Sequence, residues 1–172
     1  PLGSTNGSAT MTELAWQDDL YEFLRSRDVS IFTYVPDAGH KVLIDRSIDD
    51  PDVQSIALTT EEEGVGVLAG AHLGGARGVL MMQSSGVGNC VNFFSLVKSG
   101  GFPIFTIVSM RGDHGEGNPW QMPMGEAVEP VLRAMGIRSM RVDHPQDDIA
   151  TTAAAMTQTF QSCQSTAVLL TQ

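Results

Sequence analysis

Residues 55–83 read SIALTTEEEGVGVLAGAHLGGARGVLMMQ, and this stretch decides the fold. It contains two short apolar segments, 55–59 and 78–83, on either side of a run rich in Gly, Ala, Val and Leu. The two segments have the length of buried strands, and the run between them, 62–74, has the length of a helix. Strands that alternate with helices pair in the same direction, so the stretch predicts a parallel strand–helix–strand unit.

The same alternation continues along the chain on both sides of this stretch. Strands with continuous apolar character, rather than alternating polarity, are typical of a parallel sheet that helices cover on both faces. We therefore predict a three-layer α/β/α fold with a six-stranded parallel sheet. The other predicted strands are 29–35, 103–110, 139–143 and 166–171, and the other predicted helices are 16–27, 40–46, 90–99, 126–136 and 147–162.

The bulk composition indicates one globular domain. The chain has 172 residues, of which 42% are hydrophobic and 17% charged. Residues 1–10, PLGSTNGSAT, resemble an expression-tag remnant and linker, so we expect a single domain over residues 11–172. The two cysteines, Cys90 and Cys163, form no disulfide framework or metal spacing and are typical of a cytoplasmic protein.

The charge and hydropathy of the chain exclude two classes of partner. The formal net charge is −10, which argues against nucleic acid because binding to phosphate needs a basic surface. No apolar run has the length of a membrane span, so we expect no membrane partner.

Polar and glycine-rich segments follow the first four predicted strands. They are PDAGH at 36–40, Glu61, SSGVGN at 84–89 and RGDHGEGNPWQMPMG at 111–125. In parallel α/β folds, ligands bind at the carboxyl ends of the strands, so these segments are the candidate site. Common motifs are absent: Val91 replaces the third glycine of a dinucleotide fingerprint, and the sequence has neither a phosphate-binding P-loop nor a nucleophile elbow.

Three consecutive glutamates, Glu61 to Glu63, stand where the second strand gives way to the small-residue helix. Acidic residues in a first helical turn interact favourably with the helix dipole, by a few tenths to about 1 kcal/mol each. One or two glutamates would serve this purpose. The third is either solvated or has a chemical function.

Four motifs in order resemble the pyrimidine-binding domain of thiamin diphosphate-dependent decarboxylases. They are EEEGVGVLAGAHL at 61–73, MMQSSGVGN at 81–89, SMRGD at 109–113 and QMPMGE at 121–126. The likeness covers the chain from about Met11. Within this group, the chain is most similar to the phosphonopyruvate and sulfopyruvate decarboxylases, and for the sulfopyruvate enzyme the similarity is to its alpha subunit.

The resemblance implies a role for Glu61. In this family a glutamate at the end of the second strand hydrogen-bonds ring nitrogen N1′ of the cofactor's aminopyrimidine. This glutamate stands nine residues before a glycine of the following helix. Counting back nine residues from Gly70 gives Glu61. Glu62 is the alternative if the register slips by one. The segment 84–89 would line the aminopyrimidine, and the cofactor-binding residues implied there are Ser85, Gly86, Gly88 and Asn89.

The resemblance also implies that this chain supplies half of an active site. In the family, a second domain with a Gly-Asp-Gly motif holds the diphosphate and Mg²⁺, and the segment 112–118 does not match that motif. We expect no metal ligand on this chain. The expected partner is a beta subunit with the diphosphate-binding domain, in a hetero-oligomer whose sites lie between subunits.

The implied reaction is decarboxylation of 3-sulfopyruvate, a small anionic 2-oxo acid, to sulfoacetaldehyde and CO₂. Candidates for binding the substrate's anionic groups are His40, Arg111, His114 and Gln121, near the ends of the first and fourth strands. Arg111 has Asp113 as a possible local ion-pair partner. Phosphonopyruvate as substrate, or a non-catalytic regulatory or scaffold protein, are the alternatives. Biosynthetic use of the sulfonate, as for coenzyme M, and degradative use both remain open.

Overall fold

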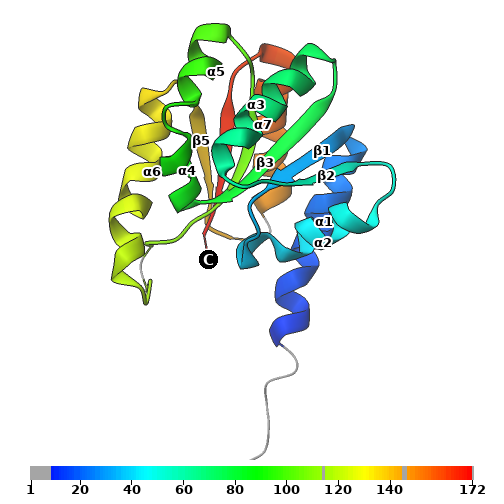
Figure 1. Cartoon of the computed structure of the whole chain (residues 1–172). Coiled ribbons are helices and arrows are strands. Elements are labelled where there is room, and N and C mark those ends of the chain that lie inside the picture. The colour runs from blue at the N-terminus through cyan, green and yellow to red at the C-terminus, as the bar shows by residue number, and fades with distance from the viewer. Residues whose placement is uncertain (1–8, 114, 145–146, 172) are drawn as a thin grey trace, which may run out of the picture.

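The computed structural model describes residues 9–113, 115–144 and 147–171 and confirms the predicted three-layer fold (Figure 1). Six strands form one sheet in the order β2-β1-β3-β4-β6-β5, and every neighbouring pair is parallel. The strands are β1 (Val29–Tyr34), β2 (Gln54–Ala57), β3 (Arg77–Gln83), β4 (Phe105–Ser109), β5 (Arg138–Val142) and β6 (Thr166–Leu170).

Seven α-helices and two short 3-10 helices connect the strands in the described part of the chain. The α-helices are α1 (Ala9–Ser26), α2 (Lys41–Asp49), α3 (Glu61–Leu73), α4 (Ser84–Cys90), α5 (Phe94–Gly100), α6 (Met122–Ala134) and α7 (Asp148–Ser162). The 3-10 helices are η1 (Ala38–His40) and η2 (Pro119–Gln121).

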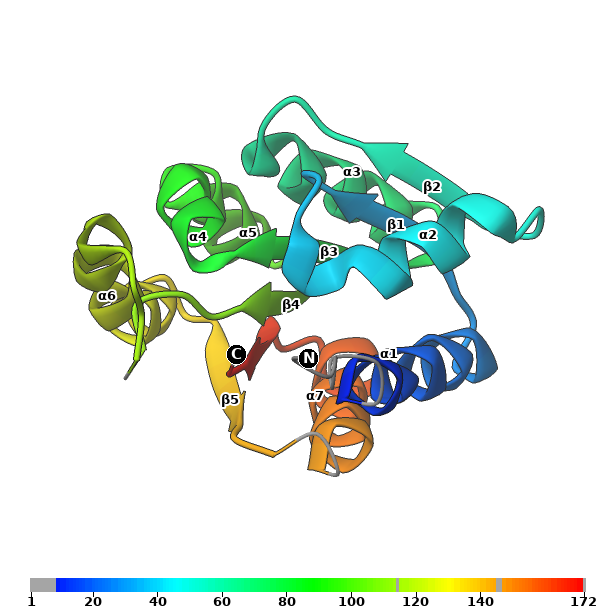
Figure 2. The same ribbon diagram turned by 90° about the horizontal axis from the view of Figure 1, so that it is seen from below.

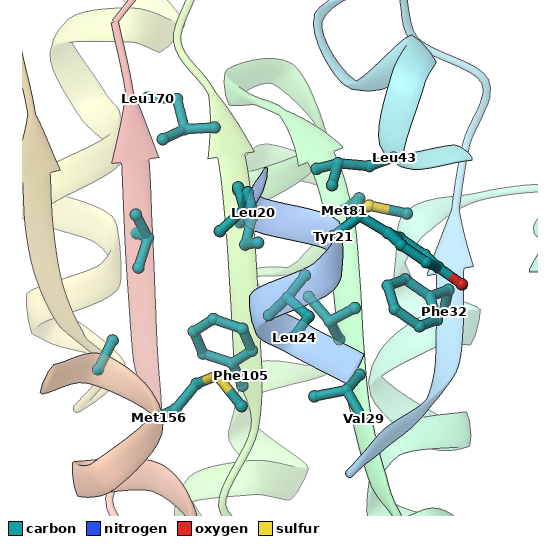
Figure 3. Close-up of a cluster of buried hydrophobic side chains, with 14 of the residues drawn as sticks. Leu20, Tyr21, Leu24, Val29, Phe32, Leu43, Met81, Phe105, Met156 and Leu170 are labelled. Atoms are coloured by element: carbon teal, nitrogen blue, oxygen red, sulfur yellow. The ribbon is translucent and has the colours of Figure 1, made fainter. Parts of the chain in front are cut away.

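The sheet separates two hydrophobic cores. Figure 2 shows helices on both sides of the sheet. Helices α1, α2 and α7 pack on one face, and α3 to α6 pack on the other. In Figure 3, Leu20 and Leu24 of α1 lie against the strands that carry Met81 and Phe105, and all four are fully buried. Strands covered on both faces explain why the sequence of each central strand is almost entirely apolar.

Two predicted segments differ from the structure. Residues 84–89 lie in a glycine-rich segment outside the predicted helices, but they form most of α4, and the single helix predicted over 90–99 is divided between α4 and α5. Residues 111–124 also lie outside the predicted helices, but η2 lies within them and α6 begins at Met122. Tertiary contacts described below override the low helix propensity of the glycines in α4.

All six strands point in one direction, so their carboxyl ends meet at a single edge, the lower edge in Figure 1. The segments after β1, β2, β3 and β4 gather there, as the sequence predicts for a ligand site. Within the described residues, no helix is long and apolar enough to cross a membrane.

Candidate functional site

Glu61 is a buried carboxylate at the carboxyl edge of the sheet. It is the first residue of α3, and only 8% of its surface is exposed. Its Oε2 accepts a hydrogen bond of 2.8 Å from Nδ2 of Asn89 on α4. A buried carboxyl group needs such partners, because desolvation without hydrogen bonds is costly.

The three glutamates have three different environments. Glu62 is half-buried and accepts a hydrogen bond from the Thr60 hydroxyl, and Glu63 is exposed and accepts one of 2.8 Å from the backbone N–H of Thr59. Glu62 and Glu63 therefore make local contacts with the two threonines that precede the helix. Of the three, Glu61 alone is buried.

Helix α4 packs tightly against Glu61 through Gly86. A Cβ atom at Gly86 would lie 2.7 Å from Oε1 of Glu61, closer than real Cβ contacts allow. Gly88 lies on another side of the helix, where a Cβ would meet Sδ of Met124 at 3.0 Å. Gly86 and Asn89 therefore belong to the Glu61 environment, Gly88 belongs to the packing between α4 and α6, and Ser85 is exposed at the start of α4.

Asp37 is a site residue that the sequence analysis missed. Its side chain is 4% exposed, and it accepts hydrogen bonds of 2.6 Å from the Ser109 hydroxyl and 2.5 Å from Nε2 of Gln83. Burial raises the pKa of the Asp37 carboxyl, but the bonds from Ser109 and Gln83, with His40 nearby, outweigh it and lower that pKa overall. A fixed negative charge thus links the ends of β1, β3 and β4.

His40 is fully buried beneath this carboxylate. Its Nε2 donates a 3.1 Å hydrogen bond to the carbonyl oxygen of Met82 and lies 4.0 Å from Oδ2 of Asp37, while Nδ1 is buried without a hydrogen-bond partner among the described residues. Burial lowers the pKa of His40 despite Asp37. In this structure His40 is a neutral group under the site rather than an exposed cation within it.

Arg111 is bound by Glu116 rather than by Asp113. Its Nε and Nη2 donate to the two carboxylate oxygens of Glu116 over 2.7 and 2.9 Å, while Asp113 pairs with Arg141 over 2.6 Å. The suggested pairing of Arg111 with Asp113 is therefore wrong. The pair with Arg111 and two backbone N–H bonds lower the pKa of Glu116 to about 2.

The structure brings only some of the predicted substrate residues together. Arg111 follows β4 at the carboxyl edge. The pKa of the Arg111 guanidinium is raised mainly by Glu116 and to a smaller extent by the negative charge of Asp37. Gln121 is half-buried at the end of η2, in the connection between β4 and α6. His114 lies outside the described residues.

No metal centre is present among the described residues, in which no group of three or more His, Cys, Asp or Glu side chains is arranged to hold an ion. Cys90 and Cys163 are unpaired, and Cys90 is buried. Burial, with Glu61 and Glu62 nearby, raises the pKa of the Cys90 thiol, so it is not an activated nucleophile. The chemistry of this edge is that of paired carboxylate and amide groups.

Comparison with known proteins identifies relatives that match about 70% of the chain. The chain is 42% identical over 119 residues to the sulfopyruvate decarboxylase subunit alpha of Methanococcus maripaludis, covering 69% of this chain and 71% of that subunit. The chain belongs to the family of sulfopyruvate decarboxylase alpha subunits. The alpha subunit of Methanocaldococcus jannaschii is 35% identical over 129 residues, which cover 74% of this chain and 76% of that one. No family model matches the chain.

In two further comparisons, the chain matches part of a longer polypeptide. The phosphonopyruvate decarboxylase of Streptomyces viridochromogenes is 32% identical over 139 residues, which cover 80% of this chain but 35% of that enzyme. A solved 2-oxoglutarate:ferredoxin oxidoreductase from Magnetococcus marinus has the same fold, with a TM-score of 0.64 and 11% identity over 90% of this chain and 28% of the other. In both proteins, most of the polypeptide has no counterpart here.

Proposed function

We propose that the chain is the pyrimidine-domain subunit of a thiamin diphosphate-dependent decarboxylase that converts 3-sulfopyruvate to sulfoacetaldehyde and CO₂. The observation that carries the proposal is the buried carboxylate of Glu61, held by Asn89 at the carboxyl edge of a chain in the sulfopyruvate decarboxylase alpha family. The free thiols of Cys90 and Cys163 support a cytoplasmic location.

The residues present fit the pyrimidine half of thiamin diphosphate. When bound, this cofactor supplies a carbon nucleophile and an electron sink for the loss of CO₂. Glu61 would hold and exchange a proton at ring nitrogen N1′, as a general acid–base group must do at hydrogen-bond distance. Asn89 and Gly86 keep that carboxylate in place, and Ser85 and Gly88 lie on the same short helix, α4.

A beta subunit would hold the diphosphate and Mg²⁺. The described residues of this chain include no group of three or more His, Cys, Asp or Glu side chains that could hold a metal ion. The surface of α3 supports a close contact with another chain: Gly66 and Gly70 are exposed, a Cβ added at either would meet no atom within 4 Å, and Leu73 is 74% exposed. Glycines in an exposed helix lower its stability unless something packs against them.

The substrate carries a carboxylate and a sulfonate, so its binding needs cationic or hydrogen-bonding groups. Arg111 and Gln121 are the candidates at the described edge, with His114 outside the described residues and His40 buried beneath Asp37. Since the chain's net charge is −10, we expect the beta subunit to supply further positive charge. The Streptomyces relative makes phosphonopyruvate the second candidate substrate.

Reconstitution tests the proposal directly. The purified chain alone is expected to bind thiamin diphosphate weakly and to release no CO₂ from sulfopyruvate, whereas addition of the subunit with the diphosphate domain should produce stoichiometric sulfoacetaldehyde and CO₂. Turnover by the chain alone would contradict the half-site. Faster turnover of phosphonopyruvate would favour the second substrate, and a complex that binds cofactor without contacting Glu61 would indicate a regulatory or scaffold protein.

A further inference from the structure

Trp120 is the most exposed large hydrophobic side chain in the described part of the chain. Its exposed fraction is 84%, and Met122, two residues later, is 36% exposed. Trp120 lies in η2, in the connection between β4 and α6, and Met122 is the first residue of α6. This connection extends beyond the carboxyl edge of the sheet at the lower left of Figure 1. A fully solvated indole is unusual, because burying an aromatic side chain is strongly favourable.

The connection that carries Trp120 is held together by one carboxylate. Glu116 is only 8% exposed and accepts two hydrogen bonds from Arg111, one of 3.2 Å from the N–H of Gly112 and one of 2.8 Å from the N–H of Asn118. Four donors on one carboxylate fix the start of the connection relative to the turn that precedes Trp120. Charge-assisted bonds of this kind are about twice as strong as neutral ones.

Backbone packing fixes the other side of the same connection. Gly112 has φ +79°, and a Cβ there would collide with the carbonyl oxygen of Gln121, while a Cβ at Gly125 would collide with that of Arg111. The side chain of Asn118 accepts a 3.2 Å hydrogen bond from the N–H of Trp120 and starts η2. Trp120 is thus exposed on a pre-ordered turn rather than on a loose loop.

A rigid turn that presents an aromatic side chain to solvent is the arrangement of a binding anchor. Tryptophan is enriched among the residues that dominate interface energies, and pre-ordering lowers the entropy lost on association. We propose that Trp120, flanked by Met122, inserts into an apolar pocket of the subunit with the diphosphate domain and anchors it over the Glu61 edge. This inference rests on the proposed function, since it takes that subunit as the partner.

Charge supports this partner over a second copy of the chain. Residues 117–126 contain one exposed carboxylate, Glu126, and no basic residue, and the whole chain has a net charge of −10. Two copies would bring like charges together, which costs free energy at an interface. The pocket that fits the anchor is therefore apolar with a basic rim. The helix that follows Trp120 packs on α4, since a Cβ at Gly88 would meet Sδ of Met124 at 3.0 Å, and α4 also carries Asn89.

Fluorine NMR tests the contact. The chain has two tryptophans, so a Trp16→Phe variant labelled with fluorotryptophan reports on Trp120 alone. Adding the unlabelled subunit with the diphosphate domain should shift this resonance and protect it from solvent. A shift on adding thiamin diphosphate and Mg²⁺ without that subunit would overturn the proposal in favour of a lid, and a shift with the chain's own concentration would overturn it in favour of self-association.

Measurements of the affinity between the two subunits are the second test of the Trp120 contact. Trp120→Ser should raise the Kd of the two subunits by at least about 30-fold, the effect of a binding hot spot, while Trp120→Phe should restore part of the affinity. The matched control is Ile48→Ser on α2, on the other face of the sheet, where the side chain is 58% exposed. Equal affinities for the wild type and Trp120→Ser would overturn the anchor alone. Absence of any complex with the wild type would overturn the proposed function and the anchor together.

Discussion

Asn89 donates a hydrogen bond from Nδ2 to Oε2 of Glu61 over 2.8 Å and so joins the end of α4 to the first residue of α3. The bond crosses between two strand–helix connections that are 28 residues apart in sequence. Glu61 therefore has one oxygen fixed by an amide that cannot take up a proton. The other oxygen, Oε1, lies over Gly86, where no side chain crowds it.

Glu61→Gln keeps the shape of this side chain and removes its proton exchange. In the assembled complex, kcat should fall on the order of 10²–10⁴-fold, as for the loss of an acid–base group, and hydrogen–deuterium exchange at C2 of the cofactor's thiazolium ring should slow. Steady-state kinetics and NMR of the bound cofactor measure the two effects.

Glu62→Gln and Glu63→Gln are the matched controls, because both side chains contact the threonines that precede the helix. They should retain turnover and cost a few tenths to about 1 kcal/mol of stability. An inactive Glu62→Gln variant beside an active Glu61→Gln variant would move the functional carboxylate by one residue. Normal turnover in all three would refute the acid–base role.

Gly86→Ala tests the packing between α4 and the carboxylate. The new Cβ would lie 2.7 Å from Oε1 of Glu61, so the substitution should destabilise the isolated chain by about 1–3 kcal/mol and displace the carboxylate. Gly66→Ala is the control, since no atom lies within 4 Å of its Cβ position, and it should stabilise the chain by about 0.5–1 kcal/mol. Urea unfolding measures the stability of both variants. Equal stabilities of Gly86→Ala and the wild type would show that α4 can move away from Glu61 at no cost.

The order of strands and helices was predictable because each central strand is buried on both faces. Leu80, Met81 and Met82 form a continuous apolar run that fits only this environment, and all three are fully buried. The helical state of residues 84–90 was not predictable, since Gly86 and Gly88 favour a loop. Their contacts with Glu61 and Met124, distant in sequence, decide the conformation.

The candidate site was predictable only in part for the same reason. Glu61 was selected from the family resemblance, and the structure buries its side chain, while its role stays a prediction. Asp37 has no motif of its own: its hydrogen-bond donors, Gln83 and Ser109, are 46 and 72 residues away along the chain. Its one signal was its place directly after Pro36, in a strand-end segment from which the sequence analysis selected only His40.

Substitutions of Arg111 and of Glu116 distinguish two roles of Arg111, binding of the substrate and support of the loop. Arg111→Ala should raise KM for sulfopyruvate more than for an uncharged 2-oxo acid, with a smaller change in kcat, if the guanidinium binds the substrate anion. Glu116→Gln weakens the same ion pair but keeps the guanidinium, so it should lower thermal stability without that selective rise in KM. Equal KM changes for the two substrates, or for the two variants, would assign Arg111 to the loop alone.

The buried imidazole of His40 should make stability depend on pH. Burial lowers its pKa below the ordinary 6.5, so as pH falls through 6.5 the unfolded chain takes up a proton that the folded chain does not. The contribution of His40 to stability should therefore be constant above this value and decline below it, by up to about 1.4 kcal/mol per pH unit for one proton. The groups facing the ring are Asp37, at 4.0 Å, and the carbonyl of Met82.

His40→Gln removes the titrating group and keeps a donor for the Met82 carbonyl, so the decline between about pH 6.5 and 5 should flatten. His72→Gln, which replaces an exposed imidazole on α3, should leave the decline in place. Asp37 and Glu116, whose pKa values are lowered, lose their contribution only at more acidic pH, below their ordinary values of 3.8 and 4.5. Urea unfolding at a series of pH values measures the slope, and an unchanged slope in His40→Gln would mean that the folded chain accommodates the protonated ring.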